Sequence, residues 1–391
     1  MRRSGILNEV IASSDVHPVP GLRERTATRV AFFVAGLAMA SWAPLVPLAK
    51  ARVGLDEGRL GGLLLCLGLG SVLAMPFSGA LAARHGCRRV ILAAGALALS
   101  ALPFMASAST VPSLAAALLA FGAGVGVVDA TMNVQAVIVE REGGRAMMSG
   151  FHGLFSVGGI AGAGGATGLL ALGLAPALAV ALLAGFSALL LALFSHGLLP
   201  YGGEAGTSPF VLPRGRVLLL GALCLVLFLA EGSVLDWSGV LLSGSRGLDE
   251  ARSGLGYAAF ATTMTAGRLA GDGIVRALGP TRVLRLGGSV AAGGFALAAL
   301  APAWPLSVLG FALVGVGASN AVPVLFSAAG RQASMPSNLA IASVTTMGYA
   351  GVLAGPALIG FVARALTLPN ALLLVAAGLV GVALSARRAT R

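Results

Sequence analysis

Two ionisable side chains stand inside long apolar stretches of this sequence. Asp129 lies roughly 10 residues before a short charged segment that begins at Glu140, and His152 follows Arg145 by about two helical turns. At about 1.5 Å per residue, each would lie about 10–16 Å along an apolar helix. Such a group is costly unless it faces a cavity or a partner, so both are candidates for function. An acid near an imidazole could exchange a proton close to neutral pH. The alternative is a polar cluster that only packs two helices together.

Further polar residues at helical spacing could bind a solute. Asn133 and Ser156 stand at the i+4 positions of Asp129 and His152, so each pair shares a helix face. A second acid, Glu231, lies in another apolar stretch and could carry a second proton. The predicted proton-coupling groups are Asp129, His152 and Glu231, and the predicted solute contacts are Asn133, His152, Ser156, Trp42, Asn320 and Tyr349. Simple packing is the alternative for each of these contacts.

The segments that must position these residues are apolar helices. Hydrophobic residues make up 57% of the chain and charged residues 10%, against about a quarter in soluble domains. The mean hydropathy is +0.93. Long apolar runs alternate with short charged loops, which is typical of an all-α polytopic membrane protein. We predict twelve spans, at residues 29–50, 60–82, 89–108, 113–139, 147–171, 175–198, 216–242, 252–277, 283–301, 305–329, 338–362 and 367–386.

The net charge of +12 follows the predicted topology. Most of the 26 Lys and Arg residues fall in loops on the same side as the N-terminus, as the positive-inside rule describes. The basic excess therefore does not indicate binding to nucleic acid. It predicts cytoplasmic termini, with tails at 1–28 and 387–391. Residues 1–28 contain no apolar core, so we expect a polar tail and not a cleaved signal peptide.

The chain divides into two similar halves. The segment GVGVVDATMN (124–133) aligns with GVGASNAVP (315–323), which pairs Asp129 with Asn320. The segment FSVGGIAGA (155–163) aligns with GYAGVLAGP (348–356) in the same way. Weak repetition between two six-span halves is the pattern of a parallel-repeat transporter with its site at the midplane. We expect a monomer with six-helix halves at 29–198 and 216–386 and a cytoplasmic linker at 199–215.

A motif of glycine and arginine lies between the second and third spans. GALAARHGCRRV (79–90) resembles the loop signature of the major facilitator superfamily, Gly-x-Leu-Ala-Asp-Arg-x-Gly-Arg-Arg, with Ala83 in place of the usual Asp. The segment 265–285 resembles a degenerate second copy, in which Asp272 could supply the missing acid. The resemblance implies a twelve-helix major facilitator fold with a conformational latch, for which the candidates are Arg84, Arg88, Arg268 and Asp272. Arg268 and Asp272 are spaced i, i+4 and could pair, with direct solute contact as the alternative.

Two narrower resemblances point to a substrate class and a location. Asp129-Ala-Thr-Met-Asn133 resembles the acid-x-x-x-Asn pattern in the fourth span of the fucose permease family of proton-coupled sugar symporters. That likeness implies a proton-binding acid at Asp129 and solute contacts from Asn133 and His152, although Val134 replaces the usual Pro and the first span has no acid. The motifs DATMNVQ, SGFHGLFSVGG, AEGSVLDWSG, TAGRLAGD and GYAGVLAGP are similar to those of YbjJ-type members, which implies a bacterial inner membrane.

These patterns predict a secondary transporter that works by alternating access. We expect proton-coupled symport of a small polar organic solute, with sugar-like solutes among the candidates. The alternative is proton-driven efflux of drugs or metabolites, because Gly351-x-x-x-Gly355-Pro356 resembles a motif of drug/proton antiporters. A membrane sensor would need an added soluble domain, and the scattered histidines argue against an enzyme, a metal site or a cofactor. The expected partners are the solute, protons and membrane lipid.

Overall fold

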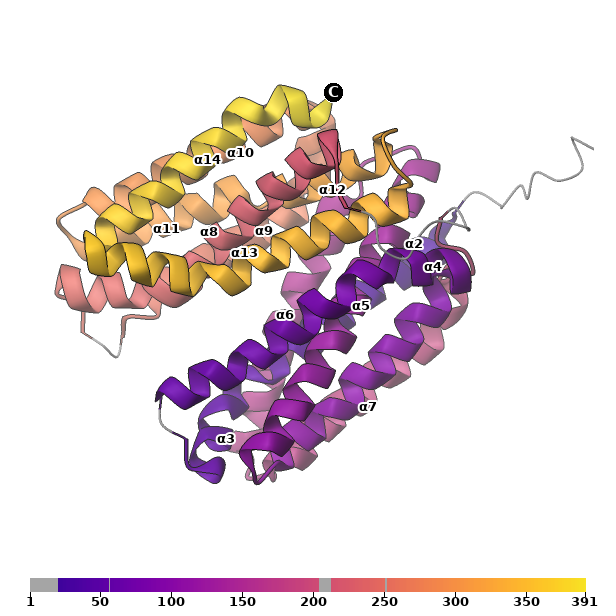
Figure 1. The fold of residues 1–391 in the computed structure, drawn as a ribbon, viewed down its shortest axis with the longest axis horizontal. Helices are drawn as coiled ribbons and strands as arrows, with labels where there is room; N and C mark the ends of the chain where they lie inside the picture. The colour runs from indigo at the N-terminus through magenta and orange to yellow at the C-terminus, as the bar shows by residue number, and fades with distance from the viewer. Residues whose placement is uncertain (1–19, 56, 204–211, 250–251) are drawn as a thin grey trace, which may run out of the picture.

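The protein is a bundle of long helices arranged in two groups. The computed structural model describes residues 20–55, 57–203, 212–249 and 252–391, and within these ranges it contains helices and no strand. Figure 1 shows the helices of the first half of the chain beside those of the second half. Nine helices in the described ranges are long and apolar enough to cross a membrane, and the bent α13 would make a tenth. The predicted all-α polytopic fold is confirmed.

The first group of helices begins with a span that is broken at prolines. Helix α2 (Leu22–Ser41) is followed by the short turn η1 (Ala43–Leu45) and by α3 (Val46–Val53). Pro44 and Pro47 stand in the first turns of η1 and α3, where their missing N–H groups are tolerated. The group continues with α4 (Glu57–Ser107), α5 (Val111–Glu142), α6 (Met148–Ala171), α7 (Pro176–Phe194) and η2 (Ser195–Gly197).

Helix α4 holds two of the predicted spans. Its 51 residues would extend about 75 Å in a straight helix. However, Gly122 of α5 lies against Leu67, and Gly124, half a turn further on, lies against Ala98. Both ends of α4 therefore flank the same part of α5, and the chain reverses at Gly86, which has φ 80° and ψ 154°. The loop that the sequence indicated at 79–90 is thus a single glycine, since only glycine adopts this backbone conformation readily.

The second group of helices contains a break that the sequence did not indicate. Its helices are α8 (Gly215–Arg246), α9 (Leu255–Leu278), α10 (Pro280–Leu300), α11 (Trp304–Ala318), α12 (Ala321–Arg331), α13 (Ser337–Ala365) and α14 (Leu368–Thr390). The predicted span 305–329 is interrupted at Ser319 and Asn320, because Pro323 cannot donate to the carbonyl of Ser319. Counting α4 twice and adding the more polar α9 would give twelve spans, and the total of twelve stays a prediction.

The two groups repeat one another in backbone detail. Gly54 and Gly247, which follow α3 and α8, have φ of 69° and 68°. Gly86 and Gly279, which follow the next helix of each half, have φ of 80° and 77° and ψ of 154° and 155°. Both pairs are separated by the same number of positions. The structure therefore repeats itself at a constant offset.

Helix packing tests the two alignments that the sequence indicated. Gly158 of α6 lies against the backbone of α2, and Gly351 of α13 lies against the backbone of α8, as the alignment of 155–163 with 348–356 requires. The other alignment is wrong by two positions. Gly122 packs on Leu67 in the first half, and Gly315 packs on Phe260 in the second half. Leu67 precedes Gly86 by as many residues as Phe260 precedes Gly279, so Gly122 corresponds to Gly315. Val322, and not Asn320, therefore corresponds to Asp129.

The first residues of the linker bind the reversal in α4. The carbonyl groups of Leu199 and Tyr201 accept hydrogen bonds from the backbone N–H groups of Arg88 (2.8 Å) and Cys87 (3.3 Å). These N–H groups begin the second part of α4 and have no partner within it. The Tyr201 hydroxyl donates to Glu142 at 3.3 Å. Burial and the Glu142 charge raise the pKa of Tyr201 to about 12, so the hydroxyl keeps its proton. Residues 204–211 of the predicted linker and 1–19 of the predicted tail lie outside the described ranges.

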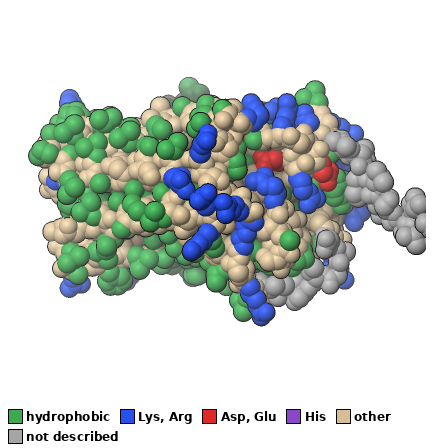
Figure 2. Space-filling model, turned by 90° about the horizontal axis from the view of Figure 1, so that it is seen from above, with side chains coloured by type: hydrophobic (Ala, Val, Ile, Leu, Met, Phe, Trp, Pro, Cys, Tyr) green, Lys and Arg blue, Asp and Glu red, His purple; other side chains and the backbone are tan. Residues whose placement is uncertain are grey.

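The two ends of the bundle differ in charge. We call the end where α2, α6, α8 and α13 begin the linker end, and the opposite one the far end. Arg282 and Arg285 near the start of α10 and Arg387 and Arg388 near the end of α14 lie at the linker end. Figure 2 shows most Lys and Arg side chains of the visible face gathered over one part of it, while many hydrophobic side chains and a few single basic ones lie over the remainder. This distribution agrees with the positive-inside pattern of the sequence.

Candidate functional site

The acid in the middle of α5 binds a tyrosine from the other half of the chain. Thr110 caps α5 by accepting from the N–H of Ser113, and the apolar residues that follow bury the helix. Asp129 is 9% exposed, and the hydroxyl of Tyr349 on α13 lies close enough to its carboxylate to interact with it. The ring of Tyr349 also makes an edge contact with Phe228 of α8, at 6.0 Å between centroids. The sequence named Asp129 and Tyr349 separately, and the structure brings them together.

A second set of polar side-chain contacts joins the halves through Arg268. The side chain of this arginine is 8% exposed, and its Nη2 lies 3.2 Å from Oε1 of Glu231 on α8. Its Nη1 donates to the hydroxyl of Ser156 on α6 at 3.1 Å. The predicted pairing of Arg268 with Asp272 is therefore wrong. Those residues share a helix face, but Arg268 is directed towards Glu231 on the neighbouring helix while Asp272 binds α6.

We call the five residues of these two sets of contacts the central polar cluster: Asp129, Tyr349, Ser156, Arg268 and Glu231. They come from α5, α13, α6, α9 and α8, so both halves contribute. Each lies well inside its helix, at a depth where an ionisable group is retained for function or is paired. The side chain of Glu231 is 22% exposed, which makes it more accessible than Arg268. The cluster can hold protons on two carboxylates and a fixed positive charge beside one of them.

His152 lies beside this cluster in an aromatic setting. Its Nδ1 lies 3.0 Å from the carbonyl oxygen of Met148, which makes Nδ1 the protonated ring nitrogen. The rings of Phe32 and Phe326 lie 5.1 and 5.8 Å away, centroid to centroid. His152 also lies near the positively charged side chain of Arg268. These ring contacts pack His152 between Phe32 of the first half and Phe326 of the second half.

The remaining predicted contacts lie around the cluster or away from it. The Asn133 amide donates to the carbonyl of Asp129 at 2.9 Å. Asn320 stands at the break between α11 and α12 and donates to the carbonyl of Gly267 at 3.1 Å, within its own half. Trp42 is buried at the far end of α2. Buried polar atoms without a partner include Oδ1 of both asparagines, Nε1 of Trp42 and Nε of Arg268. Such atoms are where a solute or ordered water would bind.

The start of α6 is held by two carboxylates, one from each half. Met147 offers no side-chain cap, so the first N–H groups of α6 need other acceptors. Glu140 of α5 accepts from the N–H groups of Met147 and Met148, both at 2.9 Å. Asp272 of α9 accepts from the N–H of Gly150 at 3.2 Å. Negative charge is favourable at a helix N-terminus, so Asp272 ties the second half to the first.

Glu140 also crosses to α12 directly. Its carboxylate accepts a hydrogen bond from the Ser327 hydroxyl and lies 3.8 Å from Nη1 of Arg331. The sequence analysis named Glu140 only as the start of a charged segment and missed Ser327 and Arg331. Their i, i+4 spacing at the charged end of a span was the available signal. We call Glu140, Asp272, Gly150, Ser327 and Arg331 the linker-end gate.

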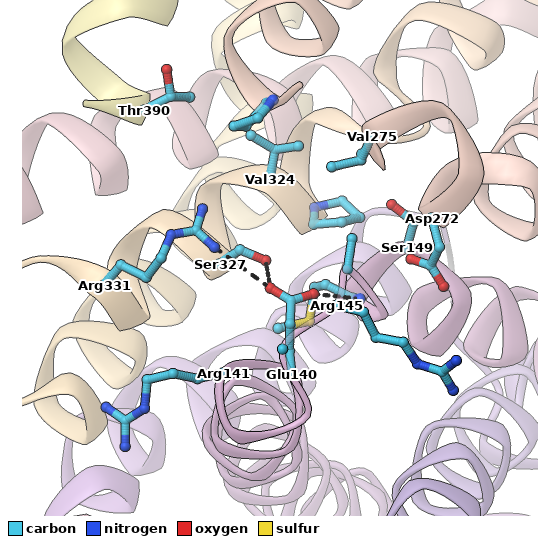
Figure 3. A pocket seen from close by; sticks show the side chains of 15 residues that line it. Glu140, Arg141, Arg145, Ser149, Asp272, Val275, Val324, Ser327, Arg331 and Thr390 are labelled. Atoms are coloured by element: carbon cyan, nitrogen blue, oxygen red, sulfur yellow. Dashed lines mark hydrogen bonds and ion pairs between the residues drawn. The ribbon is translucent and has the colours of Figure 1, made fainter. Parts of the chain in front are cut away.

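A cavity of about 440 Å³ lies over this gate and is lined by both halves. Figure 3 shows Ser327 and Arg331 directed towards Glu140 from one side, with Asp272 and Ser149 on the other side of Glu140. The other two latch candidates lie elsewhere. Arg84 is exposed and Arg88 is half-buried near Gly86, and neither guanidinium has a hydrogen bond or ion pair to the described residues. Their latch role stays a prediction.

Contacts between the halves gather at the linker end. Helix α12, which ends there, contacts α5 and α6, whereas α11, the far-end part of the same span, packs mainly on α8, α9 and α10. The start of α13 meets α4 where Asn338 donates to the carbonyl of Gly79 at 2.8 Å. The structure is therefore closed on the linker side of the central polar cluster.

The sequence and the fold agree on the class of protein. Residues 30–337 match the Major Facilitator Superfamily, and the chain belongs to this family of membrane transporters. It is 54% identical over 374 residues to an uncharacterised MFS-type transporter of Yersinia pestis, covering 95% of this chain and 97% of that protein. The predicted family and its transporter class are confirmed.

Solved structures with this fold include sugar symporters. The fucose:proton symporter FucP of E. coli, in the outward conformation, has a TM-score of 0.79 and 16% identity, with 94% of this chain and 98% of that chain covered. The proton:xylose symporter XylE has a TM-score of 0.70 and 12% identity, with 94% and 95% covered. At this identity the likeness concerns the fold.

Proposed function

We propose that this transporter moves a small polar organic solute together with protons, by alternating access in the bacterial inner membrane. The observation that carries the proposal is the proximity of Asp129 on α5 to Tyr349 on α13, because it puts a carboxylate between the two halves. A carboxylate that gains a proton there loses its charge, which lowers the cost of moving the halves past one another. The fucose:proton and proton:xylose symporters share the fold, and this favours a sugar-like solute.

The proposed cycle gives each region a task. Asp129 takes up a proton when the cluster is open to the far side, and the solute binds the hydroxyl and amide groups around it. The linker-end gate then opens, which breaks the contacts that Glu140 and Asp272 make across the halves. Proton release on the linker side, which we propose is cytoplasmic, resets the carrier. Each ligand shifts the equilibrium only through its different affinity for the two states.

The test is proton movement in proteoliposomes that hold a pH-sensitive dye. Sugars, sugar acids and cationic drugs are added to the wild type and to Asp129→Asn. We expect one solute to make the liposome lumen more acidic as protons enter with it, and we expect Asp129→Asn to lose this response and accumulation while staying folded. Asp236→Asn, at an exposed carboxylate near the far end of α8, is the matched control. Active accumulation by Asp129→Asn would sink the assignment, and proton flow opposite to a drug would indicate antiport.

A further inference from the structure

Arg268 carries a charge that the protein must neutralise at all times. Its guanidinium cannot lose its proton under physiological conditions. It is 7% exposed in the middle of α9, so its charge is removed from water. A buried cation is tolerated only when an anion lies against it, and here that anion is Glu231, at 3.2 Å. The hydroxyl of Ser156 satisfies another part of the guanidinium, and Nε has no partner.

The anion in this pair is the more accessible member. The side chain of Glu231 is 22% exposed against 8% for Arg268. Glu231 is therefore the group that a proton or a solute reaches first. A carboxylate that takes a proton no longer balances the guanidinium, and another anion then has to replace it. The pair is thus able to exchange its own carboxylate for an external one.

Among the described residues, the carboxylate that could most readily substitute for Glu231 is Asp272, one turn along α9, and it already accepts a hydrogen bond from the N–H of Gly150 on α6. The titratable groups near Glu231 are Tyr257 of α9 and Cys224 of α8. On the α6 side the neighbour of Arg268 is His152. None of these three is a carboxylate, and the carboxylate of Asp129 lies beside Tyr349 on α13. A second anion beside Arg268 must therefore come from outside the protein.

We propose that the transported solute is itself an anion, a polyhydroxylated carboxylic acid such as a sugar acid, and that its carboxylate replaces Glu231 on Arg268. This inference rests on the proposed function and specifies its substrate class. Protonation of Glu231 and arrival of the solute carboxylate leave the charge around Arg268 unchanged. Planar guanidinium groups bind carboxylates through two parallel hydrogen bonds, which suits this exchange. The hydroxyls of Ser156 and Tyr349 and the free amide oxygen of Asn133 would bind solute hydroxyl groups.

Other solute charges fit the pair less well. A neutral sugar offers no charge to replace Glu231, so Arg268 would stay paired and would serve only to join α6, α8 and α9. A cationic solute would have to approach the fixed charge of Arg268, which repels it. An acid solute requires Glu231 to leave Arg268, whereas a neutral solute leaves the pair intact. Variants of Glu231 and Arg268 therefore distinguish acid solutes from neutral ones.

The experiment compares matched acid and neutral solutes on the purified full-length protein. Galacturonate and galactose share a ring and differ at one carboxylate, and gluconate with sorbitol repeats the comparison in open-chain form. Binding is measured by thermal stabilisation, and transport by counterflow of labelled solute. We expect an acid to bind at least tenfold more tightly than its neutral partner. Arg268→Gln should lose this preference, while Arg285→Gln, at an exposed arginine of α10, keeps it.

Variants of Glu231 supply the second readout and guard against misfolding. Glu231→Gln mimics the protonated acid, so it should bind the acids with no dependence on pH between 5 and 8. The double variant Glu231→Gln with Arg268→Gln removes both charges together, so it should fold and fail to bind the acids. The proposal is overturned if neither acid binds the wild type, or if the double variant binds them as the wild type does.

The outcomes separate this inference from the proposed function. A neutral sugar carried with protons, and lost in Asp129→Asn, would leave proton-coupled symport standing and would overturn the anionic substrate. An acid that needs Arg268 but crosses without proton movement would leave the anionic substrate standing and would overturn proton-coupled symport.

Discussion

At the scale of residues, the central polar cluster depends on partners that belong to opposite halves. Asp129 is bound by Tyr349, and Ser156 is bound by Arg268. Both contacts must change when the halves move, so both couple local chemistry to the conformation of the whole chain. A contact within one half, such as that of Asn320 with Gly267, does not have this property.

The Tyr349→Phe substitution tests the first of these contacts. It removes one hydroxyl and keeps the ring against Phe228. A hydrogen bond to a charged group contributes about 1.5–3 kcal/mol, so its loss should slow solute uptake about 10- to 100-fold. Initial uptake rates in proteoliposomes measure the effect, with Tyr201→Phe, in the linker, as the control. Equal rates for Tyr349→Phe and the wild type would show that the hydroxyl has no part in the cycle.

The sequence identified most polar residues of the site but not their pairing. Asp129 and Glu231 stood out because an acid in an apolar helix is costly. Arg268 was assigned to Asp272 because spacing along one helix is all that a sequence displays. Its observed partner, Glu231, is on another helix, and that contact depends on how α8 and α9 pack. Ser327 drew no attention because a serine costs little in a helix.

At the scale of elements, α6 is controlled at its first turn. Asp272 supplies an acceptor from the other half to the N–H of Gly150, where the helix dipole favours a negative charge. Glu140 supplies another acceptor from the adjoining α5. Opening the linker end exchanges the Asp272 contact for water, whereas the Glu140 bonds to α6 can persist within the first half.

Asp272→Asn should therefore favour the state that is open on the linker side. Loss of the charge at the helix terminus weakens the closed state by about 1–2 kcal/mol, which is about a 5- to 30-fold change in population. Spin labels at Arg145 and Leu278 report the separation of α6 and α9, and we expect a larger population at long distance. Glu142→Gln, whose partner Tyr201 lies in the linker, should leave the distances unchanged.

The glycines that end the second helix of each half make a matched pair. Gly86 and Gly279 share a backbone conformation that other residues avoid, at a cost of about 1–3 kcal/mol. A side chain at Gly86 would also meet the backbone of Pro200, whereas the space at Gly279 is open. Gly86→Ala should therefore lower the unfolding midpoint in detergent more than Gly279→Ala.

The control for this pair is Gly164→Ala in α6, where the φ angle is ordinary and no atom lies within 4 Å. It should not lower the midpoint. Equal midpoints for Gly86→Ala and Gly279→Ala would contradict the contact with Pro200.

Hydropathy predicted most helices well, because apolar length is a property of local sequence. It could not locate the reversal at Gly86 or the break at Asn320, which depend on single residues.

At the scale of the whole molecule, one end is closed and positively charged. The gate contacts, the start of α13 and the first linker residues all lie at the linker end. The charge distribution predicts that this end faces the cytoplasm. In the proposed cycle, a carrier closed on that side takes up its proton and its solute from the far side.

The orientation is testable with fusions after Arg391. Green fluorescent protein fused there should fluoresce, and alkaline phosphatase should be inactive, because we expect this terminus in the cytoplasm. The same reporters placed after Leu174, between α6 and α7 at the far end, should give the opposite result. Matching results at both sites would contradict the predicted topology.

The spacing between Gly54 and Gly86 equals that between Gly247 and Gly279, and this bears on the evolutionary origin of the two halves. Two copies that keep the same backbone at the same interval derive from one six-helix ancestor that was joined to its own duplicate. No net insertion or deletion has survived in either copy between those glycines. The fourth helix differs between the copies, since one is continuous and carries Asp129, while the other is broken before Pro323.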